Sequence, residues 1–321
     1  MSTRETNTNG GIALINLGFI LNPPNGLSVS MILLLAIILG IMHGATPDEH
    51  TWPITFSYSV GSYSTRGGMK AGFIFSSGFT IQRGILTALG FLGLTAIYKR
   101  YNLDGWVYLL VGFVMFIVAF YLVKGTDLHL PLDKLFGGRV HHTTKAERLP
   151  MQEVENQLKP VPAKMALVHG FVAGWGFGAY STIITFILAP QMPNIYLAAL
   201  VGIFFGLGTM IMQIVTGALF ANIMRVKKLT IDQIKYIGTS TAIRTLYLGG
   251  LAFAILGIGI VAFPFLDNLA IGTGNPIPNL NSIGIATVLV LLVVGLIGFG
   301  SMIKGYREIM RTKRLATVEG K

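Results

Sequence analysis

Long apolar stretches alternate with shorter polar ones along most of the chain. Seven of the apolar stretches reach or exceed the roughly 17 residues that a helix needs to cross a bilayer. They are Ser28–Gly44, Ala71–Tyr98, Trp106–Val123, Met165–Ala189, Tyr196–Met224, Leu246–Leu266 and Ile283–Ile303. Gly11–Leu21 is also apolar, but it is too short to span and is predicted to be an interfacial or re-entrant piece. The pattern therefore predicts an all-α polytopic membrane protein with seven transmembrane helices.

The composition supports a bilayer as the solvent for most of the chain. Hydrophobic residues make up 52% of the sequence and charged residues only 12%. The 40 glycines fit this class, because small residues allow membrane helices to pack closely. Cysteine is absent, which excludes disulfides and thiolate ligands, so any metal site must use nitrogen and oxygen donors.

The net charge of +11 follows the predicted membrane topology rather than a nucleic-acid-binding surface. Of the 24 Lys and Arg residues, 20 fall between spans one and two, three and four, or five and six, or after span seven. The positive-inside rule places these segments in the cytoplasm. The chain is therefore predicted to lie in the cell membrane with its N-terminus outside and its C-terminus inside, with the lipid bilayer as a partner and no nucleic acid.

A polar, proline-containing linker divides the chain into two halves of three spans each. A seventh span with a basic tail follows the second half. The predicted units are an N-terminal segment at 1–27, a first three-helix unit at 28–123, a cytoplasmic linker at 124–163, a second three-helix unit at 164–266, and an extra C-terminal helix with its tail at 267–321.

The two halves share short stretches of similar sequence. Ile41–Gly44 (IMHG) is similar to Leu167–Gly170 (LVHG), and Gly72–Gly78 is similar to Gly202–Gly208. Because each unit has an odd number of spans, the second would be inverted in the membrane relative to the first. Inverted repeats are common in transporters, whose substrate sites lie near the repeat interface, often at broken helices. The sequence therefore predicts an inverted 3+3 repeat plus one C-terminal helix.

The most distinctive polar segment is His43–His50 (HGATPDEH), which follows the first apolar run at its predicted cytoplasmic end. Ionisable groups at membrane depth are costly and usually functional. On a continuous helix the two histidines would lie about 10.5 Å apart, too far to share an ion. The intervening glycine and proline favour a break, which would let His43, Asp48 and His50 converge. Imidazole and carboxylate donors suit divalent Zn, Ni, Co or Cu.

The motif resembles the signature of the nickel/cobalt transporter family (NiCoT, and the wider NicO group), in which a first-half helix carries His, four residues and then Asp-His. His43 and Asp48 match this spacing, and the Pro-Asp pair followed by histidine resembles the NicO form, but Glu49 intervenes before His50. The resemblance implies a permease with Ni²⁺ or Co²⁺ as the transported substrate, and His43, Asp48 and His50 in metal selection and passage. Glu49 either adds a ligand or shifts His50 out of the family geometry.

Three further residues are candidates for the same pathway. His169 begins the second-half counterpart of the motif and precedes a glycine-rich run that permits a bent or broken helix, so it is a candidate ligand or gate. Arg83 lies in the middle of the second span and needs an anionic partner. Asp48 or Glu49 is the obvious choice, and we expect this pair to lock the empty site. The repeat register sets Gln213 opposite Arg83 as a second gating candidate.

The leading prediction is a secondary transporter of a divalent transition metal, not an enzyme, with no bound cofactor and with import and export both open. Energy would come from an ion gradient, the membrane potential or a separate subunit, since no ATP-binding motif is present. The alternatives are a membrane-embedded metal hydrolase, a small-anion exporter of a related superfamily in which Arg83 contacts the substrate, and a membrane subunit whose polar motif docks a partner. The motif itself could also be a solvated turn that ends a helix.

Overall fold

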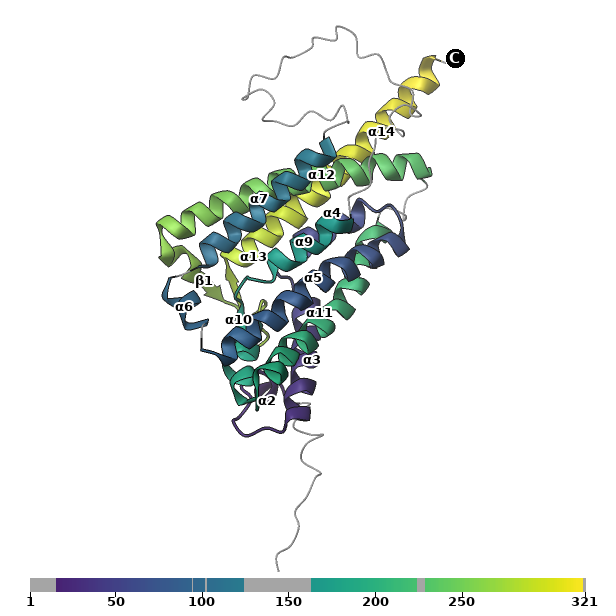
Figure 1. Ribbon diagram of the computed structural model, residues 1–321. Helices are drawn as coiled ribbons and strands as arrows, with labels where there is room; N and C mark the ends of the chain where they lie inside the picture. The colour runs from purple at the N-terminus through teal and green to yellow at the C-terminus, as the bar shows by residue number, and fades with distance from the viewer. Residues whose placement is uncertain (1–15, 94, 102, 124–162, 224–228, 320–321) are drawn as a thin grey trace, which may run out of the picture.

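The computed structural model shows a bundle of helices with one small sheet (Figure 1). It describes residues 16–93, 95–101, 103–123, 163–223 and 229–319, so the predicted linker falls almost entirely outside the described residues. Large apolar side chains such as Phe120 and Leu296, each 70% exposed, face outward from the bundle. Four described helices are long and apolar enough to cross a membrane: Asp104–Val123, Ile195–Ile223, Ile231–Ala262 and Ile285–Arg311. The predicted helical membrane architecture is confirmed at this level.

Long helices in both halves are separated by short ones. The first half contains α2 (Leu17–Leu21), α3 (Val29–Ala45), α4 (Trp52–Val60), α5 (Thr65–Phe91), α6 (Thr95–Arg100) and α7 (Asp104–Val123). The second contains α9 (Ala163–Ala173), α10 (Ala179–Thr182), the π-helix η2 (Ile183–Leu188), the 3₁₀ turn η3 (Ala189–Gln191), α11 (Ile195–Ile223) and α12 (Ile231–Ala262). The remainder contains the 3₁₀ turn η5 (Pro264–Asn268), strands β1 (Ala270–Gly272) and β2 (Ser282–Gly284), α13 (Ile285–Val290), the π-helix η6 (Leu291–Phe299) and α14 (Gly300–Glu319).

Several helix boundaries differ from those predicted by hydropathy. α12 begins at Ile231, well before the predicted Leu246, with a capping box in which Thr230 and Gln233 exchange hydrogen bonds. Its early polar residues, including Thr241 and Thr245, are fully buried, so they face other helices rather than water. The predicted second span ends early, at Phe91. Hydropathy underestimated α12 because it scores a polar side chain the same way whether the side chain meets protein or solvent.

Two helices, α5 and α11, cross at the centre of the bundle, with α3 packed on α11 and α9 packed on α5 (Figure 1). Glycine makes this crossing possible, because a Cβ at Gly72 would lie 2.1 Å from the carbonyl oxygen of Gln213, and one at Gly202 would lie 2.0 Å from that of Arg83. α7 packs along α12 beside this core. The short helix α4 contacts α5, α11 and α12 and is buried from Pro53 to Val60.

Candidate metal site

The first helix ends inside the bundle for a local chemical reason. Thr46 precedes Pro47 and adopts an extended conformation (φ −90°, ψ 146°), as residues before proline prefer, so α3 cannot continue. The Thr46 hydroxyl donates to the carbonyl oxygens of Met42 and His43, at 3.0 and 3.2 Å. These bonds satisfy carbonyls that lose their helical partners at the break.

The segment between α3 and α4 is a compact turn organised by Asp48. Its side-chain oxygen Oδ1 accepts a hydrogen bond from the backbone N–H of His50 at 3.0 Å. Its carbonyl oxygen accepts one from the N–H of Trp52 at 2.9 Å, which starts α4. Pro53 occupies the first turn of α4, where a missing N–H costs no helical hydrogen bond. The predicted break is therefore present, and it aims the side chains of the turn into the protein.

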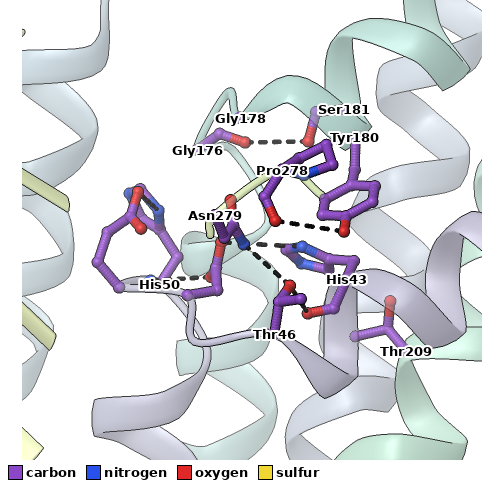
Figure 2. A network of polar contacts seen from close by, with 12 residues as sticks. His43, Thr46, His50, Gly176, Gly178, Tyr180, Ser181, Thr209, Pro278 and Asn279 are labelled. Atoms are coloured by element: carbon purple, nitrogen blue, oxygen red, sulfur yellow. Dashed lines mark hydrogen bonds and ion pairs between the residues drawn. The ribbon is translucent and has the colours of Figure 1, made fainter. Parts of the chain in front are cut away.

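The turn gathers metal-ligand atoms in one place. Asp48, Glu49 and His50 each offer one such atom, and the three atoms lie within 4.8 Å of one another. Within the described residues, this is the one group of three or more such side chains close enough to hold an ion. Nδ1 of His43 lies 3.8 Å from Oδ2 of Asp48, so the first histidine borders the cluster (Figure 2). His43, Asp48 and His50 are only 4–6% exposed, which does not fit a solvated turn.

His50 is held in place by contacts from both halves of the chain. Its Nδ1 lies 3.0 Å from Oε1 of Glu49, which also accepts a hydrogen bond from the hydroxyl of Tyr108 at 3.1 Å. On its other side the ring fills the space above Gly176, where a Cβ would lie 2.6–2.7 Å from three ring atoms. The Nε2 atom is buried with no hydrogen-bond partner in the described part of the chain, which leaves it available to an ion.

His43 is clamped by aromatic rings instead. It stacks on Phe79 and Phe205, with ring centroids 5.6 and 5.2 Å away, and meets the edge of Tyr180 at 5.6 Å. Its Nε2 is likewise buried without a partner among the described residues. The clamp therefore fixes the ring with one nitrogen facing Asp48 and the other unused.

Arg83 does not form the ion pair expected from the sequence. No carboxylate lies within ion-pair distance of it among the described residues, although the guanidinium is only 2% exposed. Its Nη2 instead donates to the carbonyl oxygen of Gly176 at 3.1 Å, and its Cζ lies 4.5 Å from the ring centroid of Phe79. Arg83 thus holds the backbone of the residue against which His50 packs.

His169 and Gln213 lie against α4 rather than in the ligand cluster. His169 is fully buried, and its Nδ1 is 2.7 Å from the hydroxyl of Tyr58. Oε1 of Gln213 accepts a hydrogen bond from the hydroxyl of Thr55 at 2.6 Å. The structure therefore brings His43, Asp48, Glu49 and His50 together but ties these two predicted residues to the neighbouring helix.

Sequence reasoning missed the residues that complete the surroundings of the site. The glycine-rich run after His169 did signal a break, and α9 indeed ends at Ala173, but nothing indicated that Gly176 would seat His50. Tyr108 lies within a uniformly apolar stretch, so its contact with Glu49 left no trace in the pattern.

Two carboxylates beyond the cluster make its surroundings more negative. Asp104, at the start of α7, interacts electrostatically with both Glu49 and His50 and accepts a hydrogen bond from the Tyr98 hydroxyl at 2.9 Å. Asp267, in η5, interacts with Asp104 and Glu49. Fields of this sign raise the local concentration of cations.

Searches with this chain against protein-family models, curated proteins and solved structures find no match. The chemistry of the site must therefore be argued from its geometry. Two carboxylates and an imidazole, with a second imidazole at the border, form a mixed nitrogen and oxygen donor set of the kind that binds divalent transition metals.

Proposed function

We propose that the protein is a membrane transporter of a divalent transition-metal cation, with Ni²⁺ or Co²⁺ the substrates implied by its resemblance to the NiCoT and NicO group. The observation that carries this proposal is the ligand cluster of Asp48, Glu49 and His50, which is buried at a helix break inside a bundle of apolar helices. Broken helices inside membrane bundles expose backbone groups and side chains to a substrate without exposing them to lipid.

The architecture of the proposal is seven spans, two of them broken. α3 and α4 together make the first span, and α9 with the short elements through Gln191 makes the fourth. The ligand cluster then lies in the middle of the first span rather than at its cytoplasmic end, where the sequence placed it. A site at this depth can be reached from either side in turn, which a transporter requires.

Reciprocal contacts support an inverted repeat. Gly72 approaches the carbonyl of Gln213, and Gly202 approaches that of Arg83; both partners of the second contact are related to those of the first by a shift of 130 residues. The same shift relates the approach of Gly40 to Phe205 with that of Gly170 to Phe75. A two-fold relation between the halves produces such pairs.

This register keeps one sequence match and replaces another. It retains Arg83 opposite Gln213, as the sequence predicted, since each carbonyl is approached by the equivalent glycine. It sets His43 opposite Ala173 rather than His169, so the two histidines are not equivalent and the metal-ligand cluster belongs to the first half alone. The repeat would therefore be symmetric in its backbone and asymmetric in its chemistry.

One observation favours a second candidate, the small-anion exporter. Nε and Nη1 of the buried Arg83 have no hydrogen-bond partner among the described residues, so they could meet an anion. The aromatic rings that face the guanidinium leave it fewer polar neighbours than the ligand cluster has, and we place this function second. The hydrolase and docking-subunit alternatives gain no specific support.

The test is metal uptake by the purified protein in liposomes. We expect Ni²⁺ or Co²⁺ to cross the membrane with the wild-type protein and to lose at least tenfold in rate with His43→Ala, Asp48→Asn or His50→Ala. Asp232→Asn, which removes a carboxylate in the first turn of α12, is the matched control and should transport normally. Equal rates in all variants would reject the transporter, and anion flux that is lost only with Arg83→Gln would favour the second candidate.

A further inference from the structure

The hairpin that leads into the last helix reaches the candidate site. β1 and β2 pair antiparallel, with Ala270 opposite Gly284, and the loop between them is braced internally. Thr273 donates its N–H to the carbonyl of Asn281 at 2.9 Å, and Oδ1 of Asn275 accepts from the N–H of Ile277 at 2.9 Å. These bonds make the loop a unit with a defined tip rather than a slack connection.

Only the tip of this hairpin is inserted into the protein. From Val261 to Gly284, Pro278 is the one buried residue, and most of the others are exposed. Asn279 beside it has a positive φ of 66°, an uncommon conformation outside glycine that Asn tolerates better than most residues. The chain turns sharply there and presents Pro278 and Asn279 to the interior.

The tip contacts both helix breaks at once. Nδ2 of Asn279 donates to the hydroxyl of Thr46, the first residue of the first break, at 3.3 Å. The hydroxyl of Tyr180, which follows the second break, donates to the carbonyl oxygen of Pro278 at 3.4 Å. Figure 2 shows the two tip residues between these partners, next to His43.

We infer that this tip is the gate on the hairpin side of the metal site, which must withdraw before an ion can enter or leave on that side. The inference rests on the proposed transport function. By the predicted topology the hairpin side is the outside. The tip closes the site by bridging Thr46 and Tyr180, so the first and second halves cannot separate on that side while it is in place.

The structure also explains how the tip could leave. Its two hydrogen bonds to the breaks are long, at 3.3 and 3.4 Å, whereas the bonds inside the loop include several near 2.9 Å. The hairpin would therefore move as a unit and break its contacts to the bundle first. The last helix, which has no place in a repeat of two three-helix units, then has a role as the anchor of the gate.

The absence of cysteine from the chain allows a clean cross-linking test. Thr46→Cys with Asn279→Cys should form a disulfide on oxidation, reduce metal uptake by at least tenfold, and recover on reduction. The matched control is Ala270→Cys with Gly284→Cys, which joins paired positions within the hairpin and leaves the tip free of the bundle. Normal uptake through the cross-linked tip would overturn the gate.

A second readout does not depend on the transported ion. A membrane-impermeant maleimide should label a single Thr46→Cys slowly in the intact protein and at least tenfold faster when residues 275–279 are replaced by Gly-Gly. Faster labelling without metal uptake in any variant would keep the gate and reject the transport function. An unchanged labelling rate in the shortened protein, with its elution profile confirming that it is folded, would overturn the gate.

Discussion

Replacing Gly176 with alanine should weaken metal binding without touching any ligand atom. The new Cβ would lie 2.6 Å from the His50 ring, and ordinary contacts begin at 3.4 Å, so the ring or the backbone must move by about 1 Å. The backbone cannot yield easily, because Arg83 holds the Gly176 carbonyl at 3.1 Å. We therefore expect His50 to be displaced from its position beside Glu49.

The size of the effect follows from what such displacements do elsewhere. Loss of a group that orients a ligand costs about 10–100-fold in metal affinity, or roughly 1.4–2.7 kcal/mol. Titration calorimetry with Ni²⁺ or Co²⁺ on the purified protein measures it. Gly178→Ala is the matched control, because a Cβ there meets nothing within 4 Å. Wild-type affinity in Gly176→Ala, or an equal loss in Gly178→Ala, would refute the reasoning.

Three smaller predictions follow from other contacts. Tyr108→Phe removes the hydrogen bond to Glu49 and should weaken metal binding by about tenfold or less in the same titration. Gly202→Ala would set a Cβ 2.0 Å from the Arg83 carbonyl and should lower the free energy of unfolding by about 1–3 kcal/mol, whereas Gly295→Ala, with nothing within 4 Å, should not; thermal melting in detergent compares the two. Arg83→Lys should lower the melting temperature and slow metal uptake in liposomes, because a lysine cannot both stack flat on an aromatic ring and reach the carbonyl at the second break. A melting point unchanged in either core variant would contradict the packing argument.

The break and its ligands could be predicted because their causes are local. Proline determines the conformation of Thr46, and the spacing of the motif brings Asp48 and His50 to the same turn once the helix stops. Hydropathy likewise located the apolar helices, since burial in lipid depends on composition over a short window. These parts of the account needed no knowledge of the other half of the chain.

What could not be predicted depends on contacts between distant segments. The seat of His50 is Gly176, and the partner of Thr46 is Asn279, which is 233 residues away. Arg83 was expected to need a carboxylate, but a carbonyl and aromatic rings satisfy it in part, and no sequence pattern distinguishes these environments. His169 resembled His43 in its local sequence and yet bonds to Tyr58.

The most direct test of the account is X-ray absorption spectroscopy of the purified protein equilibrated with Co²⁺ or Ni²⁺. The account predicts a single ion per chain with mixed nitrogen and oxygen ligands, including imidazole. The Asp48→Asn and His50→Ala variants should lose this bound ion, while Asp232→Asn keeps it. An ion bound with the same spectrum in all three variants, or no binding above that of protein-free detergent, would contradict the assignment of the site.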